Sequence, residues 1–113
     1  EAPDGTPLEG PWPPNRGFEG DAGRITLNPG DVVSRYGPPQ GRYVAPAGTP
    51  FAERSLPASY GNQPLHTYQV LKPFQVDAGK TAPWFNQPGG GQQYHLGQSV
   101  QELINSGYLA PVD

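Results

Sequence analysis

Residues 89–91 are three consecutive glycines, and they limit how this chain can fold more than any other feature. Fixing the backbone of glycine costs more conformational entropy than fixing that of any other residue, so a chain that keeps three in a row needs bare backbone there. Trp84 and Phe85 precede them, and a strand-like segment at 93–96 follows. The stretch 82–95 predicts either a surface turn ahead of a hairpin or the wall of a pocket for a flat ligand.

Glycine and proline also interrupt the rest of the chain. Of its 113 residues, 16 are Gly and 16 are Pro, which favours irregular backbone or disorder. The net charge of only −3 and the aromatic content of 11% oppose disorder, because disordered chains combine high charge with few aromatics. We therefore predict one compact α+β domain, centred on short antiparallel β-strands with few short helices.

The composition also excludes several classes of protein. Without cysteine, neither disulfides nor thiolate metal sites can form. No apolar run approaches the roughly 18 residues of a membrane span, and no signal peptide is visible. The seven basic residues are scattered, which argues against a nucleic-acid partner. Methionine is absent even at position 1, so we expect a chain cut from a longer precursor or trimmed at its start.

Short strands are predicted where β-branched and aromatic residues stand between turn residues. In the best of them, His66, Tyr68 and Val70 share one face, because side chains alternate along a strand. The acidic, Pro- and Gly-containing residues 1–10 are predicted to be a linker or tail, and 11–113 to be the domain. The predicted strands are 24–27, 31–36, 41–45, 65–71, 74–76 and 93–96, and turns are predicted at 28–31, 46–49 and 77–80.

Helical signals are few. The clearest helix is predicted at 99–106, where Ser99 and Glu102 form a capping box ahead of an apolar stripe. A single helical turn is predicted at 49–54, with Thr49 as its N-cap and a proline at the first helical position.

The sequence lacks the motifs of common catalytic classes. It has no nucleophile elbow, no dinucleotide-binding glycine motif and no phosphate loop. His66 and His95 stand 29 residues apart with no carboxylate at ligand spacing, so no metal site is predicted. Arginines that alternate with aromatics remain, a pattern that fits either ordinary surface residues or a site for pyrophosphate and a flat base. They are Arg35-Tyr36, Arg42-Tyr43 and Arg54.

Several long, unusual motifs stand in one order along the chain. They are PPNRGF at 13–18, RYGPPQGRYVAPAGTPFAERSLP at 35–57, LHTYQV at 65–70, APWFNQPGGGQQY at 82–94 and LINSGYL at 103–109. Together these motifs resemble one family, the tuberculosis necrotizing toxin (TNT) domains, and the resemblance covers about residues 11–112.

The resemblance implies a function that composition does not. TNT domains are NAD⁺ glycohydrolases that release nicotinamide and leave ADP-ribose, often cleaving NADP⁺ as well. They are exported toxin modules of larger polypeptides, with secreted fungal relatives, and act in the cytosol of a target cell. Their fold is distantly like that of ADP-ribosyltransferase toxins. Bacterial producers carry an immunity protein. NAD⁺ is the substrate, so no cofactor is implied, and a monomeric domain is expected.

Carried over by motif, the family's site residues fall on defined positions. The essential glutamine after the glycine block falls on Gln93, although the adjacent Gln92 leaves the register ambiguous by one residue. Glu53 is a further candidate for a negative charge. The implied catalytic residues are Gln93, His66 and Arg35, and the implied substrate-binding residues are Arg54, Tyr43, Tyr36, Gly91 and Gln92. The alternatives are a protein ADP-ribosyltransferase and a non-catalytic nucleotide- or protein-binding module.

Overall fold

A computed structural model describes residues 17–56 and 58–112 of the chain. Within these residues, strands dominate and all of them pair antiparallel in one seven-stranded sheet of order β1-β5-β6-β3-β2-β4-β7. This architecture confirms the predicted fold class. The strands are β1 Gly23–Leu27, β2 Val32–Tyr36, β3 Tyr43–Pro46, β4 Leu65–Val70, β5 Phe74–Lys80, β6 Gln92–His95 and β7 Leu109–Pro111. The 3₁₀ helices η2 Phe51–Arg54 and η3 Ala58–Asn62 and the α-helix α1 Val100–Asn105 complete the named elements.

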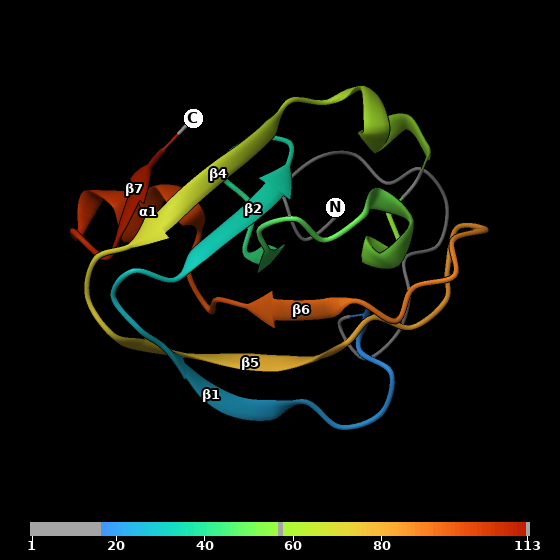
Figure 1. Ribbon diagram of the computed structural model, residues 1–113, viewed down its shortest axis with the longest axis horizontal. Coiled ribbons are helices and arrows are strands. Elements are labelled where there is room, and N and C mark those ends of the chain that lie inside the picture. Colours follow the sequence, from blue (N-terminus) through green and yellow to red (C-terminus); the bar gives the residue numbers. More distant parts are fainter. Residues whose placement is uncertain (1–16, 57, 113) are drawn as a thin grey trace.

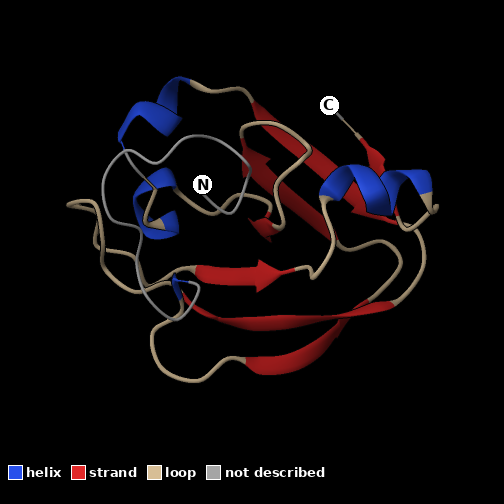
Figure 2. Ribbon diagram, turned by 180° about the vertical axis from the view of Figure 1, so that it is seen from behind, coloured by secondary structure: helices blue, strands red, loops and turns tan. Residues whose placement is uncertain are grey.

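The sheet is strongly twisted. Figure 1 shows β2 and β4 crossing the direction of β1, β5 and β6. The short strand β3 joins the two parts, because it pairs with β6 through Tyr43 and Val44 and with β2 through Ala45 and Pro46. The helix α1 lies near β7 at one end, and the 3₁₀ helices lie at the other end (Figure 2).

The hydrophobic core lies between α1 and the sheet. Val100 and Leu103 of α1 are 0% and 4% exposed and contribute its apolar face. The predicted capping box is confirmed, since the Ser99 hydroxyl accepts from the Glu102 N–H and the Glu102 carboxylate accepts from the Ser99 N–H. The buried members of the core are Leu27, Val33, Val44, Tyr68, Val70, Val76, Leu96, Val100, Leu103 and Leu109.

The structure corrects the local predictions in three places. Residues 77–80 are not a turn, because β5 continues through them with β1 paired to one edge and β6 to the other. Thr49 is not the N-cap of η2; Pro50 holds that position, and the Thr49 hydroxyl donates to the carbonyl of Pro46 at 2.7 Å. The elements η3 and β7 were not predicted at all. The predicted tail at 1–10 lies outside the described residues.

Candidate functional site

The glycine stretch packs directly against η2. The Gly89 N–H donates to the Ala52 carbonyl at 3.1 Å, and the Gly91 N–H donates to the Glu53 carbonyl at 3.2 Å. A Cβ atom on Gly91 would lie 2.9 Å from that Glu53 oxygen, closer than real Cβ atoms approach. Bare backbone is therefore needed for close approach, and the contact fixes the start of β6, where Gln93 follows two residues later.

A tight turn precedes the glycines. Trp84 and Gln87 exchange two backbone hydrogen bonds of 3.2 and 2.9 Å, and Phe85 and Asn86 between them have φ values of 52° and 60°. Positive φ at both central residues is the geometry of a type I′ hairpin turn. The turn interpretation is therefore confirmed at 84–87, the glycines pack against another segment, and the pocket wall for a flat ligand stays a prediction.

Arg54 is buried and held by polar contacts. Its guanidinium donates from Nε to the Thr49 carbonyl at 3.1 Å, from Nη1 to the Ser34 carbonyl at 3.1 Å and from Nη2 to the Ser34 hydroxyl at 2.7 Å. Its Cζ lies 5.1 Å from the ring centroid of Tyr36, a cation–π distance. Within the described residues, three of the five N–H groups of Arg54 donate to Thr49 and Ser34, so two are left for other acceptors.

Arg35 occupies a neighbouring buried position. Its Nη1 donates to the Tyr43 carbonyl at 2.7 Å. A Cβ atom on Gly41 would overlap its guanidinium, so the glycine makes room for this arginine. Burial lowers the pKa of Arg54, the Tyr36 phenol opposes that shift, and the positive charge of Arg35 adds to it. The positive charge of Arg35 thus acts on the Arg54 guanidinium.

The strand register divides the predicted site residues between two faces of the sheet. Arg35 pairs with His66, which places both on one face. Tyr43 pairs with His95, and side-chain alternation puts Gln93 on the same face as His95. We call this second face the Tyr43 face. The register of β2 and β3, in which Ser34 pairs with Ala45, also places Tyr36 on it.

The two adjacent glutamines differ in environment. Gln93 is half-buried on the Tyr43 face, opposite Gly79, whereas Gln92 is exposed and opposite Lys80. Because neighbours in a strand point to opposite faces, only one of them can share the face of Tyr43. The geometry therefore favours Gln93 over Gln92 as the functional glutamine, and that assignment stays a prediction.

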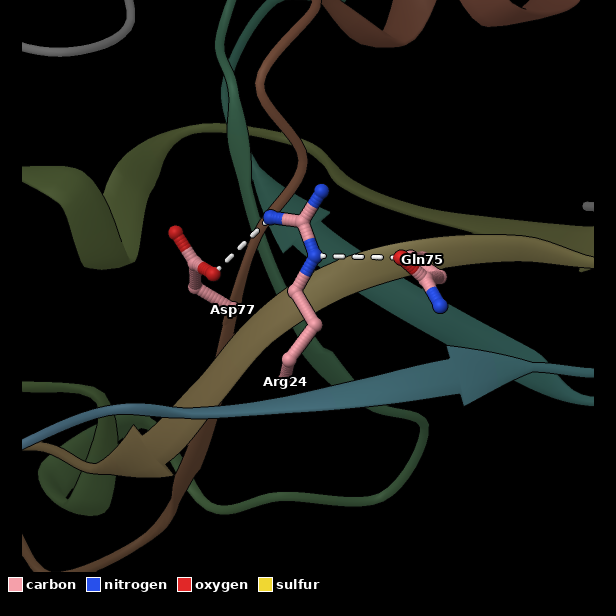
Figure 3. Close-up of polar contacts among 3 residues, drawn as sticks. All are labelled: Arg24, Gln75 and Asp77. Carbon is pink, nitrogen blue, oxygen red and sulfur yellow. Dashed lines mark hydrogen bonds and ion pairs between the residues drawn. The ribbon is translucent and has the colours of Figure 1, made fainter.

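Reasoning from sequence missed a polar row beside these residues. His95 packs against Tyr43 with ring centroids 4.8 Å apart, and Asp77 of β5 stands opposite His95 in the register. Arg24 of β1 donates to Asp77 at 3.0 Å and to Gln75 at 3.4 Å (Figure 3). The spacing of His95 two residues after Gln93 was the one available signal, since alternation places both on one face.

A pocket of about 310 Å³ lies elsewhere, between β1, β5, the segment 96–98 and α1. Arg24, Phe74, Leu96 and Tyr108 are among its walls, and it contains none of the predicted site residues. Among the described residues, no group of three or more His, Cys, Asp or Glu could hold a metal ion. Within the same part of the chain, no helix is long and apolar enough to cross a membrane.

The sequence matches a known family and a curated relative. The model of the family described as tuberculosis necrotizing toxin matches residues 26–112. The conidial surface nicotinamide adenine dinucleotide glycohydrolase nadA of Aspergillus fumigatus is 42% identical over 125 residues, which cover 99% of this chain and 52% of the relative. The chain thus spans about half the length of that relative.

Solved structures share the fold. The tuberculosis necrotizing toxin, solved in complex with its immunity factor IFT, superposes with a TM-score of 0.71 at 28% identity, over 88% of this chain and 60% of that one. Rhs1-CT, solved in complex with its cognate immunity protein RhsI1, superposes with a TM-score of 0.61 at 20% identity, over 90% of this chain and 84% of that one. The second likeness is one of fold alone.

Proposed function

The chain belongs to the tuberculosis necrotizing toxin family, and from this membership we propose that it is an NAD⁺ glycohydrolase. It hydrolyses the bond between nicotinamide and ribose, so that NAD⁺ and water yield nicotinamide, ADP-ribose and a proton. The observation that carries the proposal is the 42% identity across 99% of this chain to a relative named as an NAD glycohydrolase. NADP⁺ is proposed as a second substrate, and no cofactor is needed because NAD⁺ is itself the substrate.

The proposed chemistry needs positioning more than acid catalysis. Nicotinamide leaves as a neutral ring from a substrate in which it is cationic, so the barrier lies in forming an oxocarbenium-like ribose. A site lowers that barrier by fixing the substrate geometry and by stabilising the developing positive charge. The side-chain oxygen of Gln93 is proposed to face the nascent cation or to orient the attacking water.

Two arginines are proposed to bind the pyrophosphate. Arg54 has two N–H groups beyond those that donate to Ser34 and Thr49, and these could donate to phosphate oxygens. The positive charge of Arg35 acts on Arg54 and would add to the attraction for an anion. His66, paired with Arg35 in the register, is proposed to contact the same end of the substrate.

On the Tyr43 face, the ring of Tyr43 is proposed to pack against nicotinamide, with Tyr36 beside Arg54. The bare backbone of Gly91 allows the strand that carries Gln93 to approach η2. Glu53 of η2 is the residue whose backbone carbonyl accepts from the Gly91 N–H. Its carboxylate is proposed as a source of negative charge near the ribose.

Incubation of the purified chain with NAD⁺ tests the proposal. Free ADP-ribose and nicotinamide in equal amounts identify a glycohydrolase. Nicotinamide released only when a second protein is added and becomes modified identifies an ADP-ribosyltransferase. Unchanged NAD⁺ contradicts both and indicates a binding module or an inactive member of the family. The transferase is the second candidate because ADP-ribose transfer starts from the same bond cleavage.

The biological setting is proposed on the same basis. The tuberculosis necrotizing toxin was solved in complex with an immunity factor, and the curated relative is named for the conidial surface. These names support a secreted or delivered effector that depletes NAD⁺ in the cytosol of a target cell. A cognate immunity protein is expected if the producer is a bacterium. Co-expression with neighbouring genes, scored by rescue of growth, checks this partner.

A further inference from the structure

Four side chains from four strands lie in one row across the Tyr43 face. The register pairs Arg24 of β1 with Asp77 of β5, and Asp77 with His95 of β6. His95 in turn pairs with Tyr43 of β3. Directly opposed residues in antiparallel strands share a face, with Cβ atoms about 4.5–5.5 Å apart. The row therefore runs without interruption from the outer strand β1 to Tyr43.

The outer end of the row is an ion pair. Nη1 of Arg24 lies 3.0 Å from Oδ1 of Asp77, and the two side chains are 60% and 26% exposed. Nε of the same arginine donates to Gln75 at 3.4 Å, so its guanidinium lies between two side chains of β5 (Figure 3). The exposed arginine thus holds a half-buried carboxylate in a defined place opposite His95.

The inner end of the row is an aromatic contact. The rings of His95 and Tyr43 have centroids 4.8 Å apart and planes inclined at 61°, an edge-to-face arrangement. Just beyond the pair, the Leu96 N–H donates to the Arg42 carbonyl at 2.8 Å, and the Arg42 side chain donates to the Gly97 carbonyl at 2.9 Å. These hydrogen bonds hold the chain next to both residues, so the side-chain torsions of Tyr43 and His95 set the angle of each ring.

We propose that His95 is a positioning residue that sets the ring angle of Tyr43 for NAD⁺, and that Asp77, held by Arg24, fixes the angle of His95. This role rests on the proposed function, in which Tyr43 packs against nicotinamide. Gln93 is two residues from His95 on the same face, about 7 Å along the strand. His95 thus lies beside both residues to which that function assigns direct roles.

Steady-state kinetics with single and double variants test the row. His95→Ala is expected to raise KM for NAD⁺ about tenfold and to change kcat by less than about threefold, whereas His95→Phe, which keeps a ring against Tyr43 but loses the contact with Asp77, raises KM about fourfold. Asp77→Ala is expected to raise KM about fourfold in the natural chain and to have no further effect beside His95→Ala. Additive effects of Asp77→Ala and His95→Ala, or an unchanged KM in His95→Ala, would overturn the proposal.

Gln75→Ala is the matched control. Gln75 lies on the same strand and the same face as Asp77 and also accepts from Arg24, but its register partner is Thr26 rather than His95. Its replacement is expected to leave KM and kcat unchanged. A rise in KM equal to that of Asp77→Ala would show that loss of any Arg24 partner acts through β1, which contradicts the row.

A readout without NAD⁺ separates this inference from the proposed function. The ring resonances of Tyr43, assigned with Tyr43→Phe, are expected to shift in Asp77→Ala and to stay in place in Gln75→Ala. Unmoved Tyr43 resonances in Asp77→Ala overturn the inference even where NAD⁺ is cleaved. If the chain cleaves no NAD⁺ but the Tyr43 resonances still shift, the proposed function is wrong and the coupling between Asp77 and Tyr43 stands.

Discussion

The core beneath α1 and the corner around Arg54 are built by opposite means. The core consists of apolar side chains, several of them 1% exposed or less. The corner, by contrast, buries polar side chains whose partners are mostly backbone carbonyls. Its members are Ser34, Arg54, Ser55 and Thr81, which are 1%, 7%, 5% and 2% exposed.

The corner is closed by hydrogen bonds across segments far apart in the sequence. The Thr81 hydroxyl donates to the Glu53 carbonyl at 2.5 Å, and the Ser55 hydroxyl donates to the Ala82 carbonyl. The stability gained from buried apolar side chains depends on how closely their volumes pack, whereas a buried polar group must keep a hydrogen-bond partner of the right geometry. The corner therefore depends on hydrogen-bond geometry, whereas the core depends on close packing of apolar side chains.

The largest expected effect separates activity from stability. Gln93→Ala should lower kcat/KM for NAD⁺ by about 100- to 1,000-fold, the usual cost of losing one transition-state partner. Its thermal unfolding should match that of the natural chain, because the side chain is half-buried at the edge of the corner. Gln92→Ala, on the opposite face, is the matched control. If Gln92→Ala lost turnover instead, the functional glutamine would be Gln92 rather than Gln93.

The next effect tests the core. Leu109→Ala should lower the free energy of unfolding by about 2–5 kcal/mol, because it leaves a cavity at a side chain 1% exposed. Urea unfolding measures the change, and kcat per folded molecule should stay constant. Leu71→Ala, 47% exposed, should change stability by less than about 0.5 kcal/mol. Equal losses in the two variants would contradict the placement of the core.

Two adjacent glycines probe the corner. Gly91→Ala should cost about 1–3 kcal/mol and reduce turnover, since its Cβ would press on the Glu53 backbone. Gly90 has φ of +86° with nothing within 4 Å of a Cβ, so Gly90→Asn should cost less than about 1 kcal/mol. Chemical denaturation and NAD⁺ turnover measure both variants. A Gly90→Asn variant as impaired as Gly91→Ala would remove close packing as the reason for the glycines.

The smallest effect is a pH dependence at α1. Hydrogen bonds from the Ser99 backbone N–H, then from its side chain, lower the pKa of Glu102, and the charge of Arg42 adds to this. A lowered folded pKa means that the stabilisation is present above the ordinary glutamate value and is lost as pH falls through the folded value. The Tm of Glu102→Gln should therefore lie slightly below that of the natural chain at neutral pH and converge with it in acid. A difference that persists in acid would contradict the capping role of the carboxylate.

Local pattern was enough to predict most of the strands and the capping box. It failed at residues 77–80, where Asp, Ala, Gly and Lys are typical of a turn but extend β5, because β1 and β6 pair with both edges. It also failed at β7, whose three residues become a strand only through their pairing with β4. In each case, pairing with a strand distant in the sequence decides the conformation, and the residues of one segment alone do not reveal that pairing.

The candidate site divides in the same way. Gln93 and Tyr43 could be predicted as site residues because each lies in a motif that is contiguous in the sequence. The row from Arg24 to Tyr43 was not, since its members come from four strands and meet only through the register. The buried anchoring of Arg54 by Ser34 was likewise hidden, because no sequence spacing relates a 3₁₀ helix to a strand that it packs against.

The strand β6, which carries Gln93, also connects two parts of the sheet. In the described residues, β6 alone joins the pair β1–β5 to the set β3–β2–β4–β7. Until β6 pairs on both edges, the two halves share no hydrogen-bonded ladder, and such pairing between distant segments is slow to form. Refolding kinetics should therefore show recovery of NAD⁺ cleavage in step with the last phase of sheet formation, which makes turnover a reporter of complete assembly.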